Sequence, residues 1–184
     1  MTSRRAILIA GPTASGKSAK AIEYAKSWNG VIINADSMQV YRELQIITAR
    51  PGPSDESIVP HRLYGTVSGS IRYSVGQWIT DVTNEIESAE SKGLLPILVG
   101  GTGLYFKALT EGLAAIPDLP EEVIETWRAR AREEGPQALH ALLLERDPEM
   151  AHRLEPSDGQ RVARALAVLE ATGRSLLDWQ KQHP

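Results

Sequence analysis

The segment from Gly11 to Ser18 constrains the fold more than any other part of this 184-residue chain. It reads Gly-Pro-Thr-Ala-Ser-Gly-Lys-Ser and matches the phosphate-loop pattern Gly-x-x-x-x-Gly-Lys-Ser/Thr in full. That pattern requires a strand before it and a helix after it. An apolar run over residues 5–10 precedes the loop, and helical spacing follows it to about Trp28. We therefore expect a loop whose backbone N–H groups bind phosphate oxygens.

The same pattern predicts what the individual loop residues do. Lys17 neutralises terminal phosphate charge, and Ser18 offers a hydroxyl to Mg²⁺, which is the expected cofactor. Many protein classes share this loop, so it predicts a phosphate chain and a metal but not the reaction that follows. The diphosphate or nucleotide is expected on Gly11, Pro12, Thr13, Ala14, Ser15, Gly16, Lys17 and Ser18.

Strand and helix patterns alternate from the loop to Gly112. This alternation predicts a parallel sheet with helices on both faces, against which Trp28 and Trp78 are expected to pack. Proline, glycine, serine and acidic residues over 51–60 indicate a surface connection. The further strands are expected at 31–33, 62–67 and 94–99, and the further helices over 74–92 and 103–109.

After Gly112 the strand patterns stop, and three helices are expected over 121–134, 136–146 and 158–172. Ser157 or Asp158 suits the N-cap of the last one, and Gly173 stands just past its end. The predicted class is α/β, with a P-loop NTPase-like parallel sheet core over residues 1–112. An all-helical inserted or appended domain follows over residues 113–184.

The formal net charge of −3 excludes a positively charged nucleic-acid-binding surface that extends over the whole molecule. Any RNA-binding surface must therefore be local. Local arginine clusters exist, although solvated helix faces are the alternative explanation for them. These clusters are Arg128, Arg130 and Arg132, and then Arg153, Arg161, Arg164 and Arg174.

The chain has no cysteine, which excludes a disulfide framework and any thiolate-bound metal site. It also lacks an apolar run of the ~20 residues that a membrane span needs, so a cytoplasmic protein without membrane contact is expected. No ligand-like spacing relates the histidines, which are expected at the surface or in packing: His61, His140, His152 and His183.

Asp36 directly follows the strand expected at 31–33, which predicts a carboxylate at the carboxyl edge of the sheet beside the phosphate loop. There it can accept a proton, bind a substrate hydroxyl or join a metal shell, or it can merely cap its own loop. The strand over 94–99 ends in Gly100-Gly101-Thr102 without a second carboxylate for the metal. That ending weakens the case for nucleotide hydrolysis.

Six motifs along nearly the whole chain resemble the tRNA dimethylallyltransferase family. They are GPTASGKS at 11–18, NADSMQVY at 34–41, TARP at 48–51, PHRLYG at 60–65, VGGTGLYFKAL at 99–109 and DGQRVARALAVLEATGR at 158–174. The resemblance implies a phosphate loop that holds dimethylallyl diphosphate and an acceptor amine at N6 of the adenosine 3′ of the anticodon. Family members continue beyond this length, so the helical tRNA-binding domain is expected to be incomplete.

The resemblance also implies roles for single residues. Asp36 matches the general base for the amine, Thr102 matches a threonine at the reaction channel, and Lys17 completes the catalytic set. The expected partners are the tRNA anticodon stem-loop and dimethylallyl diphosphate, with the protein acting as a monomer. The residues expected to contact tRNA are Asp36, Ser37, Met38, Gln39, Thr102, Gln160, Arg161, Val162, Ala163 and Arg164.

Two other functions stay open at this point. A small-molecule kinase of the P-loop type would use the same loop for ATP, and a catalytically incomplete fragment would only bind phosphate or RNA. Prenylation of free adenine nucleotides is disfavoured, because the helical segment with Gln160 to Arg164 would then have no evident purpose.

Overall fold

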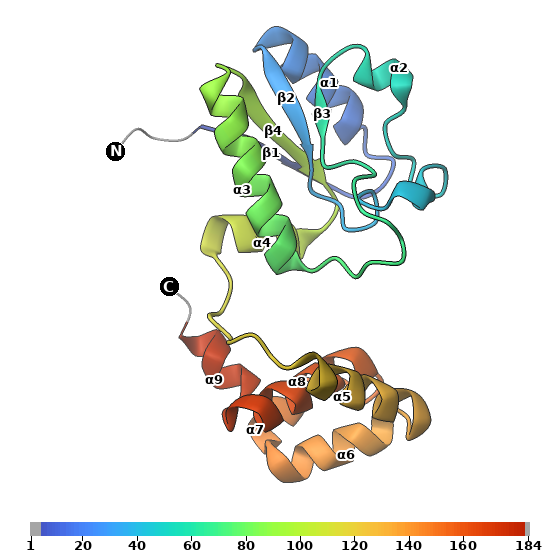
Figure 1. The fold of residues 1–184 in the computed structure, drawn as a ribbon, viewed down its shortest axis with the longest axis vertical. Coiled ribbons are helices and arrows are strands. Elements are labelled where there is room, and N and C mark those ends of the chain that lie inside the picture. The colour runs from blue at the N-terminus through green and yellow to red at the C-terminus, as the bar shows by residue number, and fades with distance from the viewer. Residues whose placement is uncertain (1–4, 183–184) are drawn as a thin grey trace. The chain divides into compact units, whose positions relative to one another are not determined.

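The structure is a computed structural model that describes residues 5–182. The chain folds into two compact units, Met1–Glu111 and Gly112–Pro184 (Figure 1). In the first unit the elements are β1 (Ile7–Ala10), α1 (Lys17–Ser27), β2 (Gly30–Asn34), the 3-10 helix η1 (Arg42–Leu44), α2 (Pro53–Glu56), β3 (His61–Arg62), α3 (Val75–Ser91), β4 (Leu95–Gly100) and α4 (Gly103–Glu111). In the second they are α5 (Glu121–Glu133), α6 (Pro136–Arg146), α7 (Pro148–Ala151), α8 (Gly159–Thr172) and α9 (Leu176–Lys181).

The first unit is built on one sheet of strand order β1-β4-β2-β3, in which every pairing is parallel. Side chains alternate between its faces, as the pleat requires. Ile32 and Ile97 pack on the side of α1, whereas Ile33 and Leu98 pack with Trp78 on the side of α3. Helices therefore cover both faces (Figure 1), and the predicted parallel α/β fold is confirmed.

The strand expected over residues 62–67 is much shorter than predicted, because β3 comprises only His61–Arg62. Leu63 and Gly65 have φ angles of 61° and 62°, a left-handed conformation that turns the chain away from the sheet. Val67 keeps only an isolated bridge to Tyr41. The connection expected over 51–60 holds the short helix α2, whose first turn is closed by the Asp55 carboxylate on the Gly52 N–H.

The two tryptophans of the first unit differ from each other. Trp78 is fully buried, and its Nε1 donates a hydrogen bond to the Asn34 carbonyl at 2.9 Å. Trp28 is 53% exposed and stacks on Tyr24, with ring centroids 4.8 Å apart. The expectation that Trp28 packs against the sheet is therefore wrong, because its position at the C-cap of α1 directs the ring along the helix surface.

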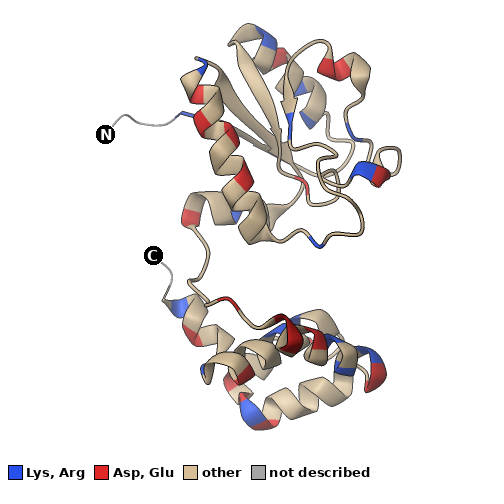
Figure 2. Ribbon diagram, in the orientation of Figure 1, with Lys and Arg blue, Asp and Glu red and all other residues tan. Residues whose placement is uncertain are grey.

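The second unit is all helical, as predicted, and has its own core. Trp127 of α5, Leu143 of α6 and Leu166 of α8 meet there, and Trp127 Nε1 donates to Glu170 Oε2 at 3.1 Å. Asp158 caps α8, and Gly173 ends it with a φ of 67°. Sequence patterns do not predict the short helix α7. Acidic and basic side chains are interspersed along these helices (Figure 2).

Gly100 ends β4 directly beside the backbone of Ala35, the residue that follows β2. A Cβ added there would lie 2.0 Å from the Ala35 carbonyl oxygen, which only backbone movement can relieve. We expect Gly100→Ala to lower the free energy of unfolding by about 3 kcal/mol or more, measured by urea denaturation. Gly76→Ala, in the first turn of α3 with only Ser74 Oγ near its Cβ, is the control and should leave stability unchanged or slightly raised. Equal stability of both variants would contradict this close approach.

Candidate active site at the ends of the strands

The phosphate loop leaves the N-terminus of α1 open. Gly16 is the N-cap residue with a φ of 81°, and no side chain caps the helix. Loop residues 12–16 are exposed, so the first N–H groups of the helix face solvent. Lys17 Nζ donates to the Pro12 carbonyl at 2.9 Å, and this places its charge over the loop. An uncapped helix start with an ammonium group beside it can bind phosphate oxygens.

Asp36 is fixed at the end of β2 by its buried neighbour Asn34. The Asn34 Nδ2 group donates to the Asp36 carbonyl at 2.9 Å and to the Leu63 carbonyl at 3.1 Å, and its Oδ1 accepts from the Asp36 N–H at 2.9 Å. Asn34 is fully buried. Its three hydrogen bonds therefore hold the backbone from which the carboxylate extends.

The two carboxylate oxygens of Asp36 have different surroundings. Oδ1 accepts from the N–H groups of Met38 and Gln39 at 2.9 and 3.4 Å, which is the loop-capping alternative. Oδ2 accepts no hydrogen bond from any residue in the described part of the chain. It lies on the side of Gly101, 3.4 Å from where a Cβ of that residue would stand. Asp36 thus caps its loop with one oxygen and keeps the other available for a ligand.

Hydrogen bonds join the ends of three strands. Thr102 Oγ1 accepts from the Ser37 N–H at 2.9 Å and donates to Ser37 Oγ at 3.3 Å. The Thr102 N–H donates to the Ala35 carbonyl, and the Gly11 N–H donates to the Gly100 carbonyl, both at 3.3 Å. The start of the phosphate loop, the Asp36 carboxylate and the Thr102 hydroxyl therefore meet at one edge of the sheet.

Two tyrosines near Asp36 were not among the residues predicted for the site. Burial, and to a lesser extent the Asp36 charge, raises the pKa of Tyr64 well above its usual range. Burial raises the pKa of Tyr105 to about 12, with smaller contributions from Tyr41 and Asp36. Both phenols stay protonated at neutral pH and can only donate or accept hydrogen bonds. The Tyr105 ring stacks on Trp78 at 4.3 Å, so its main contact is with the core.

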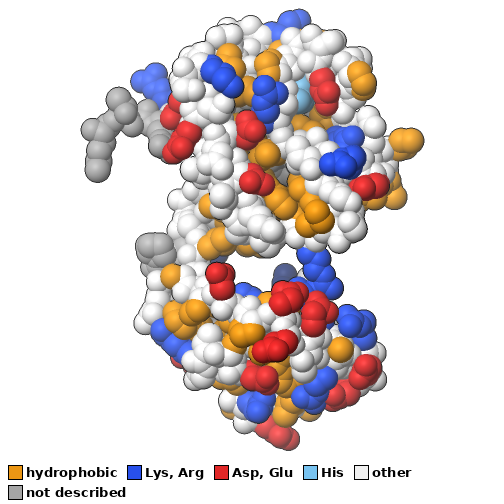
Figure 3. Space-filling model, viewed as in Figure 1, with side chains coloured by type: hydrophobic (Ala, Val, Ile, Leu, Met, Phe, Trp, Pro, Cys, Tyr) orange, Lys and Arg blue, Asp and Glu red, His pale blue; other side chains and the backbone are white. Residues whose placement is uncertain are grey.

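A cavity of about 190 Å³ borders the phosphate loop at Ser18. Its walls are mixed: Ile22, Ile32 and Val99 are apolar, whereas Asp55, His61 and Tyr64 supply polar groups. Hydrophobic side chains also lie on the surface of this unit (Figure 3), and the most exposed of them are Ile46 and Ile47.

The predicted Mg²⁺ would have few protein ligands. Among residues 5–182 no group of three or more His, Asp or Glu side chains is arranged to hold a metal ion. Mg²⁺ in phosphate-transferring sites usually keeps several waters and takes its other ligands from the phosphates and one or two protein oxygens. The exposed Ser18 hydroxyl at the start of α1 fits that requirement.

The rings of His61 and His140 contact backbone carbonyls, and His183 lies outside the described residues.

On α8 the structure separates the residues expected to contact RNA into two groups. Gln160, Arg161 and Arg164 are exposed. Val162 and Ala163 are 0% and 3% exposed, so their side chains pack in the helical core, and their contact with RNA stays a prediction. The helical period places them on the opposite face.

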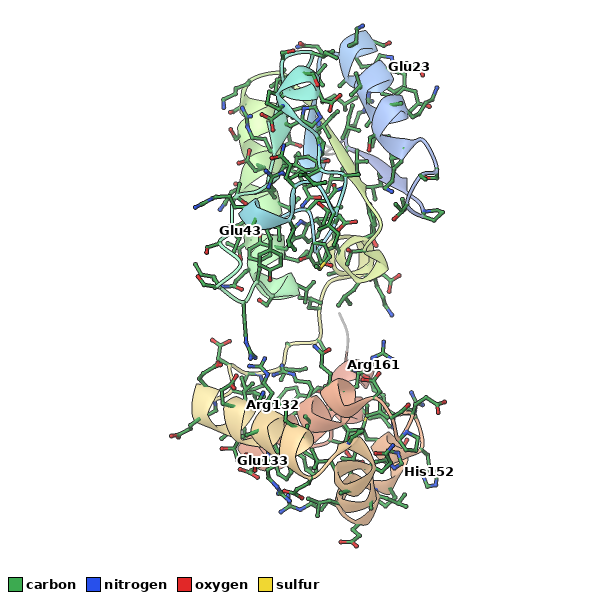
Figure 4. All side chains as sticks on the ribbon, turned by 90° about the vertical axis from the view of Figure 1, so that its right-hand side faces the viewer. Glu23, Glu43, Arg132, Glu133, His152 and Arg161 are labelled. Atoms are coloured by element: carbon green, nitrogen blue, oxygen red, sulfur yellow. The ribbon has the colours of Figure 1, made fainter. Side chains whose placement is uncertain are left out.

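The arginines of the second unit differ in their partners. Arg128 pairs with Glu125 and Glu121, and Arg130 pairs with Glu134, so both lie on solvated ion-paired surfaces of α5. Arg161 contacts Asp158 at 3.4 Å, and Figure 4 shows it on α8, with Arg132 on α5. Partial burial and the neighbouring charge of Arg128 lower the pKa of Arg164. A phosphate beside Arg164 would relieve that repulsion.

The sheet and its loop place the first unit in the P-loop class of α/β proteins. No helix within the described residues is long and apolar enough to cross a membrane. The family model described as IPP transferase matches residues 39–184, and the one described as isopentenyl transferase matches residues 4–73. The chain belongs to the IPP transferase family.

Curated relatives and solved structures agree with this family. The tRNA dimethylallyltransferases of Rhodopseudomonas palustris (strain BisB18) and Azorhizobium caulinodans are each 58% identical over 96% of this chain. The chain spans about half of their length, 56% in both cases. A eukaryotic dimethylallyltransferase acting on tRNA superposes with a TM-score of 0.80 at 30% identity, over 98% of this chain and 45% of its own. The tRNA isopentenylpyrophosphate transferase of Bacillus halodurans gives 0.60 at 36% identity, over 95% and 57%.

Proposed function

We propose that the protein transfers a dimethylallyl group from dimethylallyl diphosphate to N6 of the adenosine next to the anticodon on its 3′ side in tRNA. The observation that carries this proposal is the meeting of three groups at one sheet edge. These are the start of the phosphate loop, the free oxygen of Asp36 and the hydroxyl of Thr102. The names of the relatives support the same reaction.

The chemistry needs both an anion site and a base. The N6 nitrogen forms a bond to C1 of the allyl group while the bond from C1 to the diphosphate oxygen breaks, and the diphosphate leaves with that electron pair. The amine proton passes to Asp36 Oδ2. Because the amine lone pair is delocalised into the purine ring, removal of the proton by a positioned base is worth about 10²–10⁴ in rate.

The leaving diphosphate is assigned to the phosphate loop. Loop residues 13–18 offer backbone N–H groups, and Lys17 supplies a positive charge close to the developing negative charge. Ser18 would hold Mg²⁺, which when bound neutralises diphosphate charge. The cavity beside Ser18 offers room for hydrocarbon along its apolar side, at Ile22, Ile32 and Val99.

Two surfaces are assigned to the RNA. One is the exposed part of the segment Ser37 to Gln39 with Thr102, and the other is Gln160, Arg161 and Arg164 on α8. The adenosine must leave the anticodon loop to reach Asp36, which costs less in a loop than in a duplex. We infer a monomer that acts in the cytoplasm on the anticodon stem-loop.

We expect Arg161→Ala and Arg164→Ala each to weaken tRNA binding about tenfold at low salt. Each should also reduce the slope of log Kd against log salt by about one, because one phosphate contact is lost. Filter binding over a salt series measures both quantities. Arg146→Ala is the control, since it removes the same charge from the exposed end of α6. An equal loss in the control would indicate a general charge effect and contradict a local surface.

Labelled dimethylallyl diphosphate, Mg²⁺ and unmodified tRNA test the reaction directly. Label should enter tRNA with adenosine next to the anticodon and stay out of the same tRNA with guanosine there. Hydrolysis of ATP with phosphate transfer to a small acceptor, in the absence of prenyl transfer, would support the kinase alternative. Binding of diphosphate and RNA without any transfer would support the catalytically incomplete fragment.

A further inference from the structure

Gly101 is a glycine that the fold itself does not require. Its φ lies outside the left-handed range that favours glycine, unlike that of Gly16 or Gly65. A Cβ added to it would meet its nearest neighbours at 3.4 and 3.5 Å, which is ordinary van der Waals contact. Gly100, one residue earlier, is different because its Cβ would overlap the Ala35 backbone. Alanine at 101 would therefore be accommodated, and it would also reduce backbone freedom in the unfolded chain.

The two atoms that such a Cβ would meet are both hydrogen-bond acceptors. One is Asp36 Oδ2 and the other is the carbonyl oxygen of Gly11. Neither accepts a hydrogen bond from another group in the described part of the chain. Gly101 itself is exposed, so the space in front of it is open to a ligand. Because Gly101 has no side chain, space remains beside Asp36 Oδ2 and the Gly11 carbonyl oxygen, and neither of these two acceptors has a donor among the described residues.

We propose that Gly101 keeps open the position of the acceptor amine, which donates one N–H to Asp36 Oδ2 and the other to the Gly11 carbonyl oxygen. An exocyclic amine has two N–H donors on one nitrogen, so it matches two acceptors that border the same space. The Gly11 contact orients the amine while Asp36 takes the proton. This assignment rests on the proposed function and adds to it a residue that selects for the primary amine.

Gly101→Ala tests the assignment, with Gly103→Ala as the matched control. Gly103 begins α4, and a Cβ there would meet no atom within 4 Å. We expect Gly101→Ala to lower the transfer rate at saturating substrates by at least about 10²-fold, since the methyl group occupies the position of the amine. The dissociation constant of dimethylallyl diphosphate and the melting temperature should stay unchanged in both variants.

Binding of RNA gives a readout that does not depend on turnover. The native protein should bind an anticodon stem-loop with adenosine about tenfold more tightly than one with unsubstituted purine, which lacks the amine. Gly101→Ala should remove this preference, and Gly103→Ala should keep it.

Three results would overturn the assignment. Transfer by Gly101→Ala within about threefold of the native rate would show that the space is not needed. A parallel loss of donor binding or of melting temperature would show a structural role instead. If the native protein binds the donor and RNA but transfers no label, that result would contradict the proposed function and therefore this assignment too.

Discussion

Replacement of Asp36 by asparagine is expected to lower the rate of prenyl transfer about 10²–10⁴-fold with little change in stability. Asparagine retains an oxygen at the Oδ1 position, so the hydrogen bonds from the Met38 and Gln39 N–H groups can persist. The Asn34 hydrogen bonds reach only the backbone of residue 36 and are unaffected. Only the proton acceptor on the Gly101 side is lost.

Single-turnover transfer to tRNA and thermal unfolding, measured together, separate the two roles of this carboxylate. Glu56→Gln removes one exposed carboxylate from α2 and should leave both quantities unchanged. A fall in melting temperature that accounts for the lost rate would show that Asp36 serves only as a loop cap. Transfer by the asparagine variant at the native rate would rule out its function as the base.

Replacement of Lys17 by alanine is expected to lower kcat/KM for dimethylallyl diphosphate about 10²–10³-fold. The Nζ group rests on the Pro12 carbonyl, so its charge is already positioned over the loop before a ligand binds. The loop conformation depends on Gly16, which alanine at 17 does not alter. The loss should therefore be one of charge stabilisation and not of fold.

Lys20→Ala is the matched control for Lys17. Lys20 lies one turn further along α1, where its Nζ pairs with Glu23. Steady-state kinetics and inhibition by inorganic diphosphate should differ strongly between the two variants, with Lys20→Ala close to the native protein. Equal behaviour of both variants would contradict the assignment of the diphosphate to the loop.

Features that depend on local patterns could be predicted from the sequence. The phosphate loop, the parallel sheet and the caps of α8 follow from short motifs and from the spacing of apolar residues. The position of Asp36 at the sheet edge follows from the strand that precedes it. These predictions hold because each rests on a pattern that is contained in short stretches of sequence.

Features that depend on distant contacts or on single backbone angles could not be predicted. The end of β3 is set by the left-handed angle of Leu63, a residue whose type gives no such signal. Tyr64 lies near Asp36 only because of the sheet order. The role of Asn34 had one weak signal, a polar residue in an otherwise apolar strand pattern, which is unusual unless its hydrogen bonds are satisfied.

The hydrogen bond from Trp78 to the Asn34 carbonyl joins the interior of the sheet to the strand end that carries Asp36. The Trp78 side chain of α3 is fully buried, and Asn34 makes two further hydrogen bonds to the backbone of Asp36. In the proposed reaction, the position of the proton acceptor thus depends partly on a side chain in the buried core. Substitutions of Trp78 are therefore expected to change the position of Asp36 as well as the stability of the core.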